Sequence, residues 1–175
     1  MTSPIPLEKF DEGIRESIDN ATKFLNDAVF LHQDKRYRTS ILLSILSFEE
    51  SGKALLLMDY KSKKNEITKS QWIKKFCNHS KKNIASIVAI WKDAGFDYVI
   101  PNIRLGNLQQ ERKNASIYVD YDFMNKRWLK PDSPASIEIK GAEEYSSSTI
   151  SNASTALKCL TRRLADFDNF KKSEK

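Results

Sequence analysis

The sequence is poor in residues that break helices or cross-link chains, since its 175 residues include only five glycines, five prolines and two cysteines. Cys77 and Cys159 show no Cys-x-x-Cys spacing, so we expect two reduced, buried thiols in place of a disulfide or a zinc site. Long apolar runs are also absent, because ALLLM and IVAIW fall far short of the roughly 20 residues that span a bilayer. A composition of 40% hydrophobic and 30% charged residues then predicts a mainly helical globular protein.

The N-terminal stretch MTSPIPLEKFDEGI lacks the basic start and the apolar block of a signal peptide. We therefore expect a cytoplasmic protein with no membrane partner. A chain of this length can bury a core of its own, and we expect a single helical domain over residues 1–175.

Several kinds of active site are excluded by missing motifs. The sequence contains no Glu-x-x-His, HExxH, GxGxxG or GxSxG pattern and no Walker loop. We therefore expect no metal and no cofactor. Asp120 and Asp122 could assemble a hard-cation site with Glu49 and His79, but no motif supports that alternative. Two kinds of function remain possible: metal-free acid–base chemistry on phosphate, or binding alone.

Helical periodicity marks four segments, at residues 7–33, 36–60, 70–93 and 141–170. Ser70 is a plausible N-cap for the third helix, and Gly95 closes it. Four long amphipathic helices predict an all-α bundle.

The segment between the third and fourth helices, residues 96–140, has a different pattern. Residues 103–115 predict a short helix, and residues 116–122 (SIYVDYD) alternate as an extended segment does. Residues 126–134 (KRWLKPDSP) contain two prolines and predict a loop. We expect a short helix and an extended or loop excursion here.

Positive charge is concentrated in one part of the chain. Residues 61–82 hold eight lysines and one acid, Glu66, so this segment carries +7 while the rest of the chain sums to −1. Such a basic segment favours an anionic partner, and RNA is the commonest one in the cytoplasm. The alternative is a solvated lysine-rich helix face.

Two adjacent acids interrupt the second helix. At about 100° per residue, Glu49 points into or beside the apolar face, whereas Glu50 points to the solvated side. Gly52 lies on the same apolar face and allows another backbone to approach closely. A carboxylate in this position needs a buried partner. The plainer alternative is an i,i+4 pair between Glu49 and Lys53.

The third helix offers partners for that carboxylate. Lys75, His79 and Lys82 share one side of the predicted helix, with Asn83 beside His79, at the edge of an apolar face. His79 is a candidate general base. A purely structural histidine is the alternative, and His32 is the weaker candidate of the two histidines.

Three stretches in this order, RYRTSILLSILSFEESGKALLL, FCNHSKK, and ERKNASIYVDYD followed by a Trp and a Pro, resemble the AbiV-type abortive infection proteins of the HEPN superfamily. The resemblance runs from the first helix to about residue 131. It implies an all-α bundle, a homodimer with its site at the subunit interface, and a role in antiphage defence. Many HEPN proteins are metal-independent ribonucleases that use an Arg-x(4-6)-His motif.

This sequence departs from that motif, because no arginine precedes either histidine at the required spacing and the nearest match is Lys74 before His79. Matched by position, the resemblance implies a catalytic set of His79, Arg112 and Glu49. It also implies that Lys53, Lys82, Tyr118 and Asp120 lie in the same polar site. Together with Lys75 and Asn83, which the helical wheel places near His79, these residues are the expected substrate-binding set.

The leading hypothesis is an antiphage ribonuclease in which His79 is the general base or acid, Arg112 and Lys82 stabilise phosphate charge, and Glu49 orients His79 or Arg112. Residues 61–82 would hold the RNA backbone. A phage-encoded activator is a further candidate partner. One alternative is a non-catalytic module that blocks translation by binding a phage or host protein, and another is a nucleotide-binding sensor.

Overall fold

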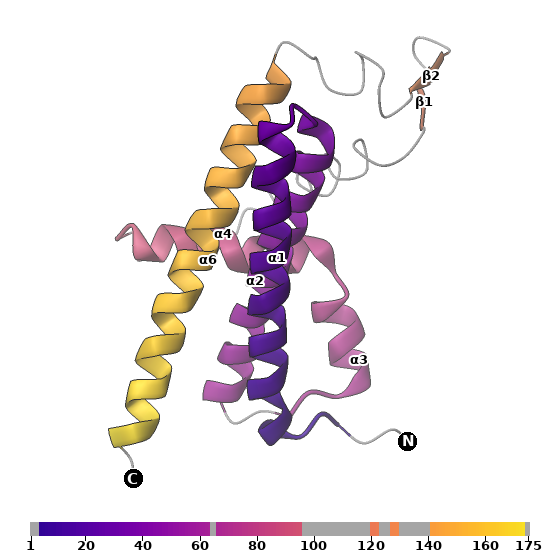
Figure 1. Ribbon diagram of the computed structural model, residues 1–175. Helices are drawn as coiled ribbons and strands as arrows, with labels where there is room; N and C mark the ends of the chain where they lie inside the picture. The colour runs from indigo at the N-terminus through magenta and orange to yellow at the C-terminus, as the bar shows by residue number, and fades with distance from the viewer. Residues whose placement is uncertain (1–3, 64–65, 96–119, 123–126, 130–140, 174–175) are drawn as a thin grey trace.

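The computed structural model describes residues 4–63, 66–95, 120–122, 127–129 and 141–173 (Figure 1). Its described part contains four long helices: α1 (Phe10–Gln33), α2 (Tyr37–Ser62), α4 (His79–Asp93) and α6 (Ala142–Ser173). The predicted all-α bundle is therefore confirmed, and the first, second and fourth helices fall close to their predicted bounds. None of the described helices combines the length and apolar character that a membrane-spanning segment requires.

The first two helices form an antiparallel pair. A 3₁₀ turn, η1 (Leu7–Lys9), leads into α1. Between α1 and α2 the chain reverses at Lys35, whose φ of 61° is left-handed, and the backbone N–H of Arg36 donates to the Leu31 carbonyl at 2.8 Å. This short connection places α1 and α2 side by side along most of their length (Figure 1).

Helix α2 lies at the centre of the bundle and packs against α1, α4 and α6. A helix enclosed in this way buries residues on all its faces. Small side chains let the helices approach, and their hydroxyls are satisfied by carbonyls of the neighbouring helix. Ser40 Oγ donates to the Ala28 carbonyl and Ser47 Oγ to the Ala21 carbonyl, both at 2.7 Å.

The predicted third helix, residues 70–93, is wrong as a single element. The chain instead forms α3 (Lys69–Gln71), the π-helical turn η2 (Trp72–Phe76) and then α4. Thr68, not Ser70, caps α3 in a capping box with Gln71, and the Asn78 side chain accepts from the Lys81 N–H at 3.1 Å to start α4. A second cap inside the segment is the reason for the break.

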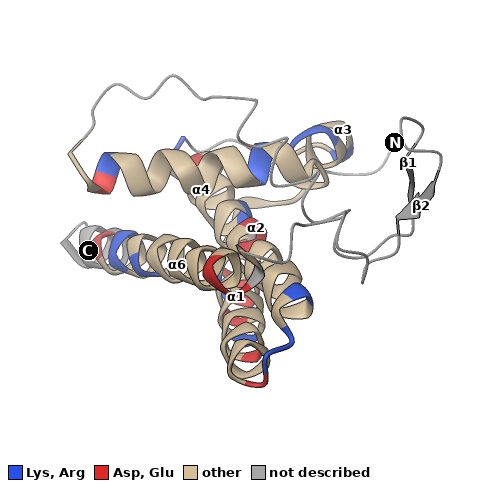
Figure 2. Cartoon of the chain, turned by 90° about the horizontal axis from the view of Figure 1, so that it is seen from above, with Lys and Arg blue, Asp and Glu red and all other residues tan. Residues whose placement is uncertain are grey.

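After this break the chain changes direction, and α4 runs across α2 (Figure 2). Gly95 follows the end of α4 with a φ of 87°, which confirms it as the residue that closes this helix.

A short antiparallel hairpin lies between α4 and α6. Strand β1 (Asp120–Asp122) pairs with β2 (Arg127–Leu129), and Tyr121 stands opposite Trp128. The extended prediction is confirmed at residues 120–122, but the loop prediction is wrong at residues 127–129. Aromatic residues opposite one another favour strand pairing, and the prolines follow only after this strand. The short helix predicted at residues 103–115 lies outside the described residues.

The main core forms where α1, α2, α6 and the η2 segment meet. Its largest members include Phe10, Ile14, Leu57, Phe76 and Leu160. Near the N-terminus, the Ile5 N–H donates to the Ile67 carbonyl at 2.8 Å, which ties the chain start to the segment before α3. This core anchors η2 and therefore fixes where α4 begins.

Candidate functional site

The centre of the candidate site is a buried carboxylate in the middle of α2. The side chain of Glu49 is 2% exposed, and its Oε2 lies 2.5 Å from Nδ1 of His79, the first residue of α4. The structure therefore brings together the acid and the histidine that the sequence suggested as partners.

A lysine completes this cluster from the next turn of α4. Lys82 Nζ lies 3.7 Å from the same Glu49 oxygen, and the lysine side chain is 8% exposed. A buried carboxylate is costly unless it is paired and hydrogen-bonded. Lys82 supplies the opposite charge and His79 supplies a hydrogen bond, so α4 compensates the burial of Glu49.

The close crossing of α2 and α4 depends on Gly52. A Cβ atom placed on Gly52 would lie 1.9 Å from the carbonyl oxygen of Lys82, so no larger residue fits there without a shift of α4. One turn further along α4, Ser86 Oγ donates to the Phe48 carbonyl at 2.7 Å. The predicted close approach of a backbone at Gly52 is confirmed, and it sets α4 directly over Glu49.

The geometry suits acid–base chemistry. An ionised carboxylate only accepts hydrogen bonds, so in this contact Nδ1 of His79 is the donor to Glu49. The His79 side chain is 43% exposed, so part of the ring lies at the protein surface. A buried carboxylate that orients a partly exposed histidine is the arrangement of many general bases.

The neighbouring acid, Glu50, is not the solvated residue that its helical angle predicted. Its side chain is 14% exposed, and its Oε2 receives a hydrogen bond from Lys53 Nζ at 2.6 Å. The i,i+4 alternative, in which Lys53 pairs with Glu49, is therefore replaced by an i,i+3 pair with Glu50. Because α2 is enclosed by other helices, the face that carries Glu50 is covered as well.

The other predicted site residues do not join the cluster of Glu49, His79 and Lys82 in the described part of the structure. Lys75 lies on η2 with its ammonium 4.8 Å from the centre of the Tyr60 ring. Asn83 is fully buried, and neither polar atom of its side chain has a hydrogen-bond partner among the residues that the structure describes. Asp120 stands in β1 opposite Leu129. Arg112 and Tyr118 lie outside the described residues.

The second histidine has a structural environment. His32 Nδ1 lies 3.0 Å from Ser146 Oγ, which itself donates to Ser40 Oγ at 2.9 Å. The His32 ring also lies against Tyr37, with 5.3 Å between ring centres. His32 thus links the end of α1 to α2 and α6.

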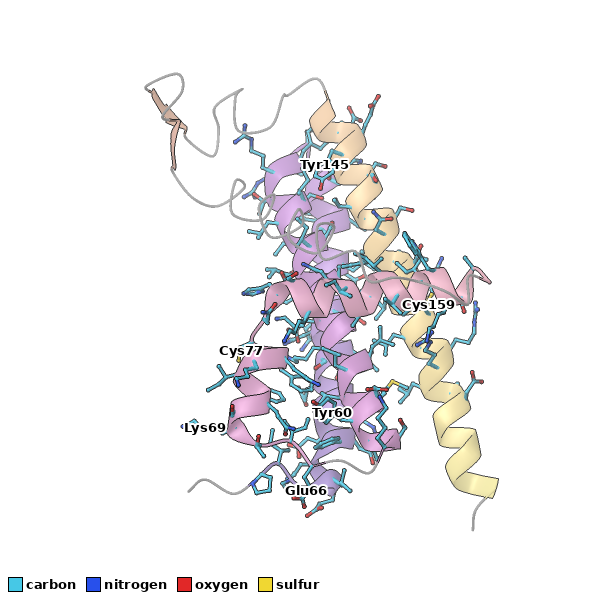
Figure 3. All side chains as sticks on the ribbon, turned by 180° about the vertical axis from the view of Figure 1, so that it is seen from behind. Tyr60, Glu66, Lys69, Cys77, Tyr145 and Cys159 are labelled. Atoms are coloured by element: carbon cyan, nitrogen blue, oxygen red, sulfur yellow. The ribbon has the colours of Figure 1, made fainter. Side chains whose placement is uncertain are left out.

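The basic segment 61–82 is not one uniform surface. Lys61 pairs with Asp11, Lys63 Nζ lies 2.8 Å from Asp59 Oδ1, and Lys82 is buried beside Glu49. Besides the paired Lys63, the exposed lysines of the described segment lie on α3, on η2 and in the first turn of α4: Lys69, Lys74 and Lys81. As Figure 3 shows, Lys69 and Cys77 lie on the side of the molecule where η2 joins α4.

Taken together, the fold and the site define a helical-bundle protein with a histidine–carboxylate centre at a helix crossing. The family model HEPN_AbiV, described as AbiV, matches residues 9–151, which is more than half of the chain. The chain therefore belongs to the AbiV family of HEPN proteins, an abortive-infection family of antiphage defence. Comparison with curated proteins and with solved structures gave no match.

Proposed function

We propose that this protein is an abortive-infection ribonuclease that impairs translation by cleaving RNA without a metal ion. The observation that carries the proposal is the 2.5 Å contact between Nδ1 of a half-exposed histidine, His79, and Oε2 of a buried carboxylate, Glu49. Such a pair holds the imidazole in one orientation and one tautomer, as a general base requires.

In the proposed reaction, Nε2 of His79 removes the proton from a ribose 2′-hydroxyl. The 2′-oxygen then attacks the adjacent phosphorus, the bond from phosphorus to the 5′-oxygen breaks, and that oxygen takes up a proton from water, while the imidazolium returns its proton to solvent. The products are a 2′,3′-cyclic phosphate and a 5′-hydroxyl. Glu49 does not touch the RNA in this scheme, because its side chain is buried, so it is a positioning residue that stabilises the imidazolium.

The lysines divide between two roles in this proposal. Lys69, Lys74 and Lys81 are exposed on α3, on η2 and in the first turn of α4, and they contact the phosphate backbone. Lys82 neutralises Glu49, because its side chain is 8% exposed and its ammonium lies 3.7 Å from the carboxylate. Arg112 stays a candidate for stabilising the phosphate charge, and a homodimer and a phage-encoded activator stay candidate partners.

A second function is favoured by the burial of the cluster. An acid that is 2% exposed and a lysine that is 8% exposed also suit a purely structural ion pair. In that case the protein is a non-catalytic interaction module that blocks translation by binding a phage or host protein. The two functions differ in what they require of His79.

The experiment compares wild-type protein with His79→Ala and Lys23→Ala, both in cells and with purified protein and labelled RNA in EDTA. Loss of a general base lowers cleavage by about 100-fold or more. Lys23→Ala is the control, since it removes one exposed charge from α1, away from the lysines proposed to contact RNA, and leaves the histidine in place. Unchanged RNA decay and unchanged growth arrest with His79→Ala would contradict catalysis and favour the interaction module.

A further inference from the structure

A second candidate site lies on the opposite side of α4 from Glu49. A cavity of about 390 Å³ opens between α2, η2, α4 and α6. Its apolar floor comes from α2 and α4: Leu55, Leu56, Ile84, Ala85, Val88 and Ala89. Its charged residues come from all four segments: Asp59, Lys75, Lys81, Lys92 and Arg163.

The cavity is separate from the histidine–carboxylate site. At about 100° per residue, Lys81, Ile84, Val88 and Lys92 share one side of α4, and the residues that face Glu49 lie on the other side. No lining residue of the cavity belongs to the Glu49 cluster. Figure 2 shows the pattern along α4, with basic residues toward both ends and uncharged residues between them.

The cations around the cavity are not compensated. Lys81, Lys92 and Arg163 form no ion pair with any residue in the described ranges, whereas the neighbouring Arg162 is paired with Asp93 at 2.6 Å. The one lining acid, Asp59, is already paired with Lys63 at 2.8 Å. The opening of the cavity is therefore positively charged, while its floor is apolar.

We propose that this cavity binds a small organic anion with a compact apolar body. The body packs on Leu55, Ile84 and Val88, and a carboxylate, sulfonate or phosphate meets the cations at the opening. A volume of about 390 Å³ is within the range of small-molecule sites, which are mostly apolar with a few polar groups that fix orientation. An adjoining hollow of about 300 Å³, which shares Leu55 and Arg163, leaves room for a longer apolar chain.

The site shares Lys81 with the proposed RNA contacts but none of the residues around Glu49, and its test reads dye binding without RNA, so it can fail or succeed independently of the ribonuclease proposal. The test uses the purified full chain and the fluorescent anion 8-anilinonaphthalene-1-sulfonate, titrated to saturation. We expect one dye per chain, and binding about tenfold weaker in Arg163→Gln, because a charge-assisted contact is lost. Val88→Glu places an acid on the apolar floor and should abolish binding.

Two controls keep the test specific. Ile73 is an exposed apolar residue on η2 that does not line the cavity, so Ile73→Glu should bind the dye as wild type does. N-phenyl-1-naphthylamine, which has the same aromatic body without the sulfonate, should bind at least about tenfold more weakly. Circular dichroism identifies variants that bind dye only because they have lost their fold.

Three results would overturn the proposal. The first is dye binding that Arg163→Gln and Val88→Glu leave unchanged, and the second is equal binding of the uncharged amine. The third is displacement of the dye by an acidic amphipathic peptide but not by dodecanoate, which would make the surface a protein-docking site. Displacement by dodecanoate but not by dodecylamine would support an organic anion.

Discussion

His79 Nδ1 and Glu49 Oε2 are separated by 30 positions in the sequence and by 2.5 Å in the fold. The contact joins the first residue of α4 to the middle of α2. The same pair of atoms contributes to stability and to the proposed function. Variants of either residue therefore need both a stability measurement and an activity measurement.

Glu49→Gln should lower the melting temperature strongly. The substitution leaves the Lys82 ammonium buried without its carboxylate, and breaking a buried ion pair typically costs about 3–5 kcal/mol. The double variant Glu49→Gln/Lys82→Met removes both charges and should recover much of this loss. Thermal unfolding of the three proteins measures the effect. If the double variant is less stable than Glu49→Gln, the proposed charge compensation is wrong.

Gly52→Ala should destabilise the protein by about 1–3 kcal/mol, because the added methyl group collides with the Lys82 carbonyl and the helices must separate. Gly13→Ala is the matched control. A Cβ on Gly13 would lie 3.3 Å from the flexible end of Leu57, and alanine favours a helix over glycine by about 1 kcal/mol. Chemical denaturation compares the two. Equal effects would argue against a close crossing at Gly52.

Asn78→Ala should lower stability by about 1 kcal/mol through loss of the cap on the Lys81 N–H. Because His79 is the next residue, fraying of the first turn of α4 should also reduce the proposed RNA cleavage. Asn78→Asp preserves the acceptor and should keep both properties close to wild type. Denaturation midpoints and cleavage rates test this, and a cap that contributes nothing would leave Asn78→Ala identical to wild type.

The two cysteines should react at very different rates with a thiol reagent. The expectation of two buried thiols is wrong for Cys77, which is exposed, and confirmed for Cys159, which is buried. Burial raises the pKa of the Cys159 thiol above its ordinary value of 9.0. We expect one labelled thiol per native chain at neutral pH and two after unfolding. Cys77→Ser should then give none in the native state, and rapid labelling of that variant would contradict the burial of Cys159.

The same raised pKa gives the pH dependence of this group a definite sign. The folded protein holds the Cys159 proton more tightly than the unfolded chain does. Its contribution to stability is therefore fully present below pH 9.0, the ordinary value, and is lost as the pH rises through the folded pKa.

Helical periodicity was sufficient for most of the fold and for part of the site. The 3.6-residue pattern predicted α1, α2 and α6, because apolar residues three and four positions apart mark one face of each helix in the sequence itself. The same angular reasoning separated Glu49 from Glu50 and identified Gly52 as a place of close approach. These features depend on residues within one or two helical turns.

The features that were not predicted depend on tertiary packing. Glu50 is covered because α2 has helices around it, and periodicity along α2 alone does not show its neighbours. The break before α4 rests on a single capping side chain, Asn78, within an otherwise periodic segment. The cavity lined by Val88 and Arg163 joins residues from four segments, so no local pattern in the sequence indicates it.

The crossing at Gly52 also determines how the two ends of α4 can move relative to α2. Helix α4 meets the α2 backbone near Lys82, three residues after His79 and ten residues before Lys92. At about 1.5 Å per residue, the short arm is about 4.5 Å and the long arm about 15 Å. If α4 tilts as a rigid body about this contact, its two ends move in opposite directions. A displacement of the backbone at Lys92 is then accompanied by an opposite displacement at His79 of about a third of the size.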